Sequence, residues 1–149
     1  MSGSAKPATV HFYFDFDADV LGVAKIVAAL RPDVTYPGDP GAVVHRRQRP
    51  PCPITSGRTA DTVWIPETAR REWLIITRDS RIQHHRAEIE AVRTSGARMI
   101  ALASEEAGGT WDQLEVLMSQ WRAIERRLEE PGPFIYTATR TTLRPVDLK

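Results

Sequence analysis

The chain has 149 residues, a formal net charge of +1, and hydrophobic and charged fractions of 42% and 26%. These values are typical of one ordinary globular domain with a core of its own, and the near-neutral charge excludes a global basic field. No apolar run approaches the roughly 20 residues of a membrane span, so we expect no membrane partner. The single cysteine, Cys52, excludes an internal disulfide and a cysteine zinc site.

The N-terminal residues 1–8 are small and polar and contain one Lys. This composition predicts a disordered tail, with residues 9–149 forming a single domain. A stretch of this kind is not a signal peptide, so the expected location is the cytoplasm.

Strands and helices are predicted to alternate along the domain. Hydrophobic periodicity and turn residues first predict a strand at 9–15, a helix at 19–31 and a strand at 33–36, followed by a Pro- and Arg-rich irregular segment at 37–60. A helix then begins at Asp61 and is interrupted or restarts at Pro66. The remaining predicted elements are a strand at 73–77, a helix at 81–95, a strand at 98–103, a helix at 110–128, a strand at 134–139 and a polar, basic tail. This alternation indicates an α/β fold with a mostly parallel sheet, whose right-handed crossovers place helices on both faces.

Two further patterns concern helix ends and aromatic packing. The segment from Thr110 to Gln113 matches a capping box, which predicts the start of the long helix. The four tryptophans fall on apolar faces of predicted elements, so we expect them to pack in the core: Trp64, Trp73, Trp111 and Trp121.

Acidic residues follow two of the predicted strands. Asp15 ends the first strand, and Asp79 comes just after the continuous apolar strand that begins at Trp73. Because ligands bind at the carboxyl ends of parallel strands, and neighbouring strands lie about 5 Å apart, these two carboxylates can converge. Asp61, which opens the intervening helix, and Asp17 can join them. Clustered carboxylates repel one another unless a cation lies among them, and hard oxygen ligands suit Mg²⁺ or Mn²⁺. For any one of these acids, a turn or helix cap is the simpler interpretation.

The pattern Asp61-(x)7-Ala69-(x)3-Trp73-Leu-Ile-Ile-Thr-Arg-Asp79 resembles a segment of the PIN and PIN-like nucleases. The strand ending in Asp15, and the helical stretch after it, are similar to the start of the shorter PIN-like group. The resemblance covers roughly residues 9–103. It implies a three-layer α/β/α sandwich with the activity of a metal-dependent endoribonuclease, often the VapC-type toxin of a bacterial toxin–antitoxin pair.

Carried over by position, the resemblance makes Asp15, Asp61 and Asp79 the catalytic and metal-binding acids, with Asp17 beside them and Mg²⁺ or Mn²⁺ as cofactor. Thr77 would orient Asp79 or a bound water. The implied partners are RNA and an antitoxin protein, and a homodimer is possible. Arginines Arg78, Arg81, Arg46 and Arg47 are candidates for holding the RNA backbone, because guanidinium groups bind phosphates in a bidentate manner. A solvated surface is the simpler interpretation of any single Arg.

Two other functions remain open at this stage. The family pattern has a further acid in a helix before Asp61, but here the corresponding loop contains only Asp39, which favours a PIN-like module that binds without catalysis. The Asp15–Phe16–Asp17 motif also resembles that of haloacid-dehalogenase-type phosphatases. That chemistry needs a downstream Lys, and none occurs between Lys25 and Lys149, so we rank it below the nuclease.

Overall fold

The computed structural model describes residues 5–14, 18–78, 86–103 and 107–148. Its elements in chain order are β1 Lys6–Pro7, β2 Phe12–Phe14, α1 Ala18–Leu30, β3 Val34–Thr35, β4 Ala42–Val44, β5 Arg47–Arg49, α2 Asp61–Arg70, β6 Leu74–Arg78, α3 Arg86–Ser95, β7 Arg98–Leu102, α4 Thr110–Arg126, the 3-10 turn η2 Arg127–Glu129, β8 Phe134–Ala138 and β9 Leu143–Pro145. Within these residues, no helix has the length and apolar character needed to cross a lipid bilayer.

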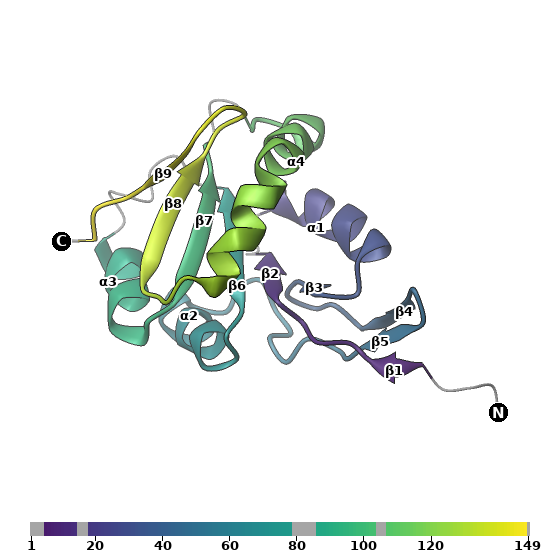
Figure 1. Cartoon of the computed structure of the whole chain (residues 1–149). Helices are drawn as coiled ribbons and strands as arrows, with labels where there is room; N and C mark the ends of the chain where they lie inside the picture. The colour runs from purple at the N-terminus through teal and green to yellow at the C-terminus, as the bar shows by residue number, and fades with distance from the viewer. Residues whose placement is uncertain (1–4, 15–17, 79–85, 104–106, 149) are drawn as a thin grey trace.

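The central sheet has six strands in the order β3-β2-β6-β7-β8-β9 (Figure 1). All neighbours pair in parallel except β8 and β9, which are antiparallel. The predicted α/β fold with a mostly parallel sheet is therefore confirmed. Strand β3 lies on one side of β2, and the later strands β6, β7 and β8 lie on the other side. The strand order thus reverses between β2 and β6.

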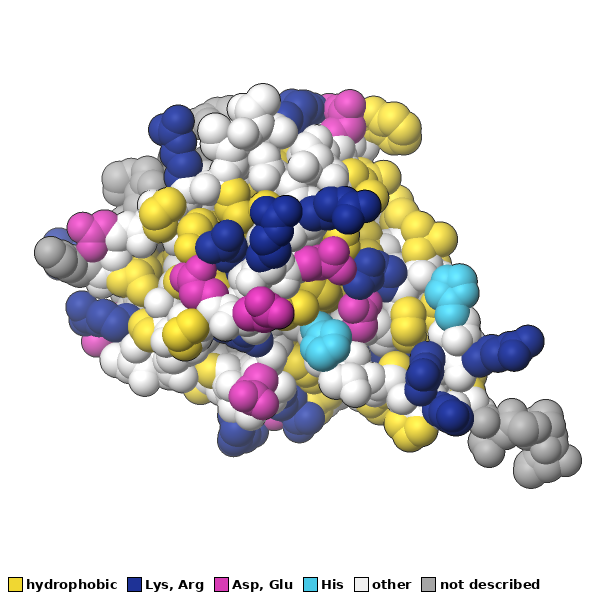
Figure 2. All heavy atoms as spheres, viewed as in Figure 1, with side chains coloured by type: hydrophobic (Ala, Val, Ile, Leu, Met, Phe, Trp, Pro, Cys, Tyr) yellow, Lys and Arg dark blue, Asp and Glu magenta, His cyan; other side chains and the backbone are white. Residues whose placement is uncertain are grey.

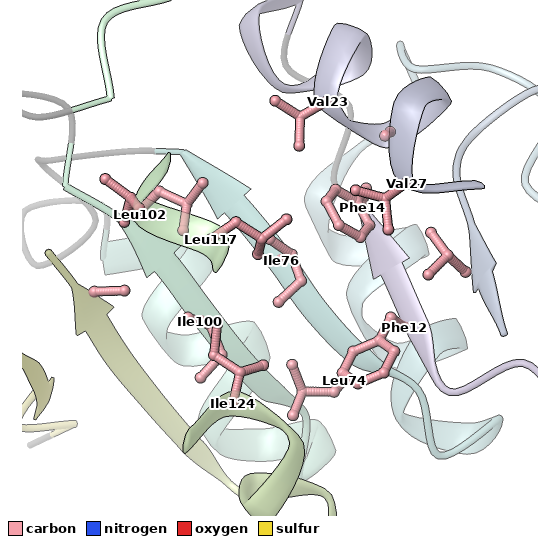
Figure 3. Close-up of a cluster of buried hydrophobic side chains, with 14 of the residues drawn as sticks. Phe12, Phe14, Val23, Val27, Leu74, Ile76, Ile100, Leu102, Leu117 and Ile124 are labelled. Atoms are coloured by element: carbon pink, nitrogen blue, oxygen red, sulfur yellow. The ribbon is translucent and has the colours of Figure 1, made fainter. Parts of the chain in front are cut away.

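Helices cover both faces of this sheet, as the sequence predicts. Phe12, Phe14, Leu74 and Ile76 face the layer formed by α1 and α4, where they lie in one buried apolar cluster (Figure 3). Alternate residues of β2, β6, β7 and β8 face α2 and α3 on the opposite side, in a second cluster: Tyr13, Ile75, Met99, Ala101 and Ile135. This two-residue alternation is what lets a continuous apolar strand serve two cores at once.

One connection departs from the expected handedness. The steps β6–α3–β7 and β7–α4–β8 run in the same direction along the sheet, yet α3 and α4 cover opposite faces. The two connections therefore have opposite hands. The prediction that every crossover is right-handed is wrong for one of them.

The Pro- and Arg-rich segment contains a second, smaller sheet in the order β1-β5-β4. Strands β4 and β5 form an antiparallel hairpin, and β1 pairs in parallel with β5. This corrects two predictions, because Lys6–Pro7 is not part of a disordered tail and the segment is not wholly irregular. A buried ion pair holds the hairpin in place: Arg49 Nε donates to Asp39 Oδ2 over 2.7 Å.

Three smaller predictions are also corrected. Helix α2 runs through Pro66 without restarting. Helix α4 begins after Gly109, without a side-chain cap, so the capping box does not form. The C-terminal tail adds strand β9 to the sheet, and Leu148 packs against the α2–α3 cluster.

Tryptophan burial follows the prediction only in part. Trp64 and Trp73 are 5% and 7% exposed, whereas Trp111 is 74% exposed. Helix α4 buries the side defined by Val116, Leu117 and Ile124. Trp111 lies outside that buried side. The apolar stripe of α4 is wider than the part of the helix that α1 and the sheet cover, so Trp111 at its edge stays exposed.

We expect Trp111→Ala to change the free energy of unfolding by no more than about 0.5 kcal/mol, because an exposed ring loses little buried area. Trp64→Ala, in the core, should cost about 3–5 kcal/mol. Urea denaturation of both variants measures this difference. Equal destabilisation would show that Trp111 is covered in solution.

Candidate active site

The candidate site lies where the strand order of the sheet reverses. In open α/β sheets, ligands bind outside the carboxyl ends of the strands at such a switch point. Strands β2 and β6 are direct neighbours here, and Phe14 is paired with Ile76. In the sequence, Asp15 follows the last residue of β2 and Asp79 follows the last residue of β6. The topology therefore brings the strands that precede these two acids side by side.

Four of the predicted site residues lie outside the part of the chain that the structure describes: Asp15, Asp17, Asp79 and Arg81. Whether the three catalytic carboxylates meet stays a prediction. Within the described residues, no three His, Cys, Asp or Glu side chains lie close enough together to hold a metal ion. A metal site with three such ligands would therefore need at least one residue from outside the described part of the chain.

Thr77 is the buried residue before the end of β6, with 2% of its surface exposed. It is paired with Ala101 of β7. Because side chains alternate along a strand and Ile75 belongs to the α2–α3 cluster, Thr77 faces the same side of the sheet. Its position suits the predicted orienting role near Asp79.

Asp61 is an exposed residue at the start of α2, and its carboxylate has a defined partner. The indole Nε1 of Trp64 donates a hydrogen bond to Asp61 Oδ1 over 2.9 Å. The Trp64 ring packs against Tyr13 of β2, with ring centroids 5.6 Å apart. This chain of contacts ties Asp61 to the strand that leads into Asp15, and it puts Asp61 on the same side of the sheet as Thr77.

Trp64 orients the Asp61 carboxylate in the structure, whereas the sequence predicted it only as a core residue. Its spacing of three residues from Asp61 within one helix is the signal that could have identified it, since side chains at that spacing are neighbours. The ring of Tyr13 also stacks on Trp73, at a centroid distance of 5.7 Å. Aromatic packing on both sides of Tyr13 thus holds the indole that orients Asp61.

The three predicted RNA-binding arginines that the structure describes, Arg46, Arg47 and Arg78, do not form one group. Arg78 ends β6, at the carboxyl end of the sheet. Arg46 and Arg47 are exposed on the β4–β5 hairpin, and Arg47 lines a cleft with His11, which immediately precedes β2. Since β2 and β6 are parallel, Arg47 and Arg78 lie at opposite ends of the strands.

Three further residues of the Pro- and Arg-rich segment bear on the site and are buried: Asp39, Arg49 and Cys52. Arg49 is 3% exposed and forms an ion pair with Asp39. Asp39, the only acid in that segment, is thereby excluded as a replacement for the missing family acid. Burial raises the pKa of the Cys52 thiol, which keeps the thiol in its neutral, weakly nucleophilic form.

The fold defines the class of this protein: a three-layer, doubly wound α/β domain with a candidate site at its switch point. Comparison with known families makes the assignment narrower. The model of the PIN-like domain family matches residues 14–104, which is more than half of the chain, so the chain belongs to this family. The match runs from the end of β2 to just beyond β7 and includes the Asp61 helix and the β6 strand. Neither the curated proteins nor the solved structures contain a match to the chain.

Proposed function

We propose that this PIN-like protein is a divalent-metal-dependent endoribonuclease. PIN-like domains are generally associated with nucleases, and PIN domains typically use divalent metals. The observation that carries the proposal is the Asp61–Trp64–Tyr13 chain of contacts. A lone surface carboxylate that only capped a helix would need no buried indole to orient it, and Asp61 makes no side-chain cap in α2.

The residues present fit a hard divalent cation. Asp61 offers carboxylate oxygens, and Trp64 is the only hydrogen-bond donor that reaches them from the described residues. Asp15 and Asp79 would complete an oxygen-only set, with Asp17 beside it, which suits Mg²⁺ or Mn²⁺. When bound, such an ion lowers the pKa of a water molecule and stabilises charge on a phosphodiester.

Side chains of the protein itself carry out the rest of the proposed mechanism. Trp64 fixes the orientation of the Asp61 carboxylate, and Thr77, two residues before Asp79 in the sequence, would orient the Asp79 carboxylate. Arg78 and Arg81, on either side of Asp79 in the sequence, contact the phosphate of the RNA. Bidentate guanidinium contacts would hold the phosphodiester in line for attack by water.

A biological context follows from the same proposal. We propose that the protein is the toxin of a bacterial toxin–antitoxin pair, whose antitoxin masks the acidic site. The reading frame next to its gene should then encode a small inhibitory partner. Co-expression with that partner should abolish RNA cleavage by the purified complex.

A binding module without catalysis is the second candidate. It is favoured by the engagement of Asp39 with Arg49, which leaves the family's further acid without a counterpart. The phosphatase is disfavoured, because the family match places the chain among PIN-like domains and the required Lys is missing. Incubation of purified, inhibitor-free protein with labelled RNA and Mn²⁺ separates the two candidates. Cleavage that stops with EDTA supports the nuclease, whereas intact RNA contradicts it.

Trp64→Phe tests the positioning role of the indole. The substitution keeps an aromatic ring against Tyr13 but removes the N–H that binds Asp61, so we expect about a tenfold lower kcat with little change in KM. Raising the Mn²⁺ concentration should recover part of the activity. Trp73→Phe is the matched control, since Trp73 packs on the same Tyr13 but does not contact Asp61. Equal kcat in both variants would contradict the role.

A further inference from the structure

A cleft of about 620 Å³ lies between the small sheet and the end of α1, away from the candidate active site. His11, Arg31, Asp33, His45 and Arg47 are among its lining residues. His11 immediately precedes β2, so the cleft opens at the amino end of the strand whose carboxyl end leads into Asp15. The cleft and the candidate metal site are thus at opposite ends of the same strand.

The charge around this cleft is positive. Arg31 is neutralised within the cleft wall, because its Nε and Nη2 donate to the two carboxylate oxygens of Asp33 over 2.9 and 2.8 Å. Three exposed cations remain, which we name the basic patch: Lys6, Arg46 and Arg47. In the described part of the chain, none of the three has an acidic partner. Figure 2 shows Lys and Arg side chains gathered beside His over this region, next to the N-terminal end.

Like charges in the basic patch are placed next to each other. Lys6 of β1 is paired in register with Arg47 of β5. Strands in a sheet lie about 5 Å apart, and like charges in such a cross-strand pair repel each other. An anion that bridges the two side chains would remove this repulsion. The pairing of Lys6 with Arg47 therefore favours binding of a negatively charged ligand at this position.

The turn that carries Arg46 of the basic patch is conformationally costly. His45 and Arg46 form the two-residue connection of the β4–β5 hairpin, with φ of 50° and 64°. Such turns favour Asn-Gly, because other residues adopt positive φ only at a cost in free energy. The hairpin is nevertheless fixed, since His45 Nε2 lies 3.1 Å from the carbonyl oxygen of Leu30 and Arg49 Nη1 donates to that of Ala28 over 3.0 Å. The basic residues are thus presented on a rigid support.

We propose that the basic patch and its cleft bind the phosphate backbone of single-stranded RNA. This inference rests on the proposed function and extends it, because it adds a second contact region beyond the candidate active site. Repeated phosphates can satisfy several cations at once, and Arg47 and the histidines at the cleft offer hydrogen-bond donors to phosphate oxygens. The basic patch and the candidate active site would then contact different nucleotides of the same RNA strand.

The test compares two triple variants with equal charge change. Lys6→Gln/Arg46→Gln/Arg47→Gln removes the basic patch. Arg122→Gln/Arg126→Gln/Arg144→Gln is the matched control, because these arginines are also exposed and lie outside the cleft. Binding of a labelled single-stranded RNA is measured by fluorescence anisotropy at several salt concentrations, in EDTA so that no cleavage occurs. Equal thermal melting curves establish that both variants are folded.

We expect the patch variant to bind at least tenfold more weakly at 0.1 M salt. Its slope of log affinity against log salt should fall by about 2, since each single-strand phosphate contact contributes about 0.7. The control variant should keep the wild-type slope. Equal losses in both variants, wild-type binding by the patch variant, or binding of poly-glutamate but not RNA would overturn the proposal. RNA cleavage in Mn²⁺ is measured separately. If the wild-type protein does not cleave RNA but the patch variant still loses RNA binding, the proposed nuclease activity is rejected and the proposed RNA-binding patch is kept.

Discussion

Asp79→Asn is expected to lower the rate of Mn²⁺-dependent RNA cleavage about 1,000-fold, and Asp15→Asn is expected to do the same. The side-chain size is almost unchanged, but the amide is neutral and a much weaker ligand for a hard cation. A bound metal contributes several kcal/mol to transition-state stabilisation, and each 1.36 kcal/mol corresponds to a tenfold change in rate. The pairing of β2 with β6 is the structural reason for treating the two acids as one site.

Asp112→Asn is the control for this experiment. Asp112 is a half-exposed carboxylate on α4 that pairs with Arg140, on the face of the sheet opposite Asp61, so its loss should leave cleavage unchanged. Titration of Mn²⁺ by calorimetry adds a measurement that does not depend on turnover. We expect both Asp15→Asn and Asp79→Asn to weaken Mn²⁺ binding. Full activity and unchanged metal affinity in either variant would remove that residue from the site.

Asp39→Ala is expected to destabilise the protein by about 3–5 kcal/mol, which is the usual cost of leaving one member of a buried ion pair without its partner. The side chains of Asp39 and Arg49 are 0% and 4% exposed. Thr35 Oγ1 also donates to Asp39 Oδ2 over 2.9 Å, and Arg49 reaches the carbonyl oxygens at the end of α1. Loss of the carboxylate therefore removes the side-chain link between the hairpin and Thr35 of β3, and leaves the Arg49 guanidinium with only backbone carbonyl oxygens as partners. Urea denaturation measures the change.

A second variant distinguishes the ion pair from simple packing. Asp39→Leu/Arg49→Met replaces both charges by apolar groups and should cost less than Asp39→Ala alone, because no buried charge is left without a partner. Glu90→Gln is the surface control. It breaks an exposed ion pair with Arg93 and should change stability by no more than about 0.5 kcal/mol. A double variant as unstable as the sum of its single variants would show that the two charges do not interact.

The main strands could be predicted closely because their signal is local. The predicted strand at 73–77 is β6 at Leu74–Arg78, and the predicted strand at 98–103 is β7 at Arg98–Leu102. Each of these strands serves two cores, so its side chains are apolar almost without interruption. The β4–β5 hairpin lacks such a run. It depends on β1 and on the Asp39–Arg49 pair, which are contacts between distant residues that no window of sequence contains.

The candidate site, too, could be predicted from the sequence only in part. The sequence supplies three acids with a recognisable spacing, and it identifies Thr77 at the end of the central strand. It does not show that Trp64 holds Asp61, because a tryptophan on an apolar helix face is usually core. It also groups Arg46 and Arg47 with Arg78, although the structure separates them by the length of the sheet.

The sequence by itself determined the α/β class, the main strands and the PIN-like resemblance, because apolar periodicity and short motifs are properties of neighbouring residues. Only the tertiary structure decided which strands pair. The neighbouring positions of β2 and β6, the link from Asp61 to β2 through Trp64, and the in-register pair of Lys6 and Arg47 all follow from that pairing. Strand order is set by how the helices close both faces of the sheet over the core, and that packing is non-local.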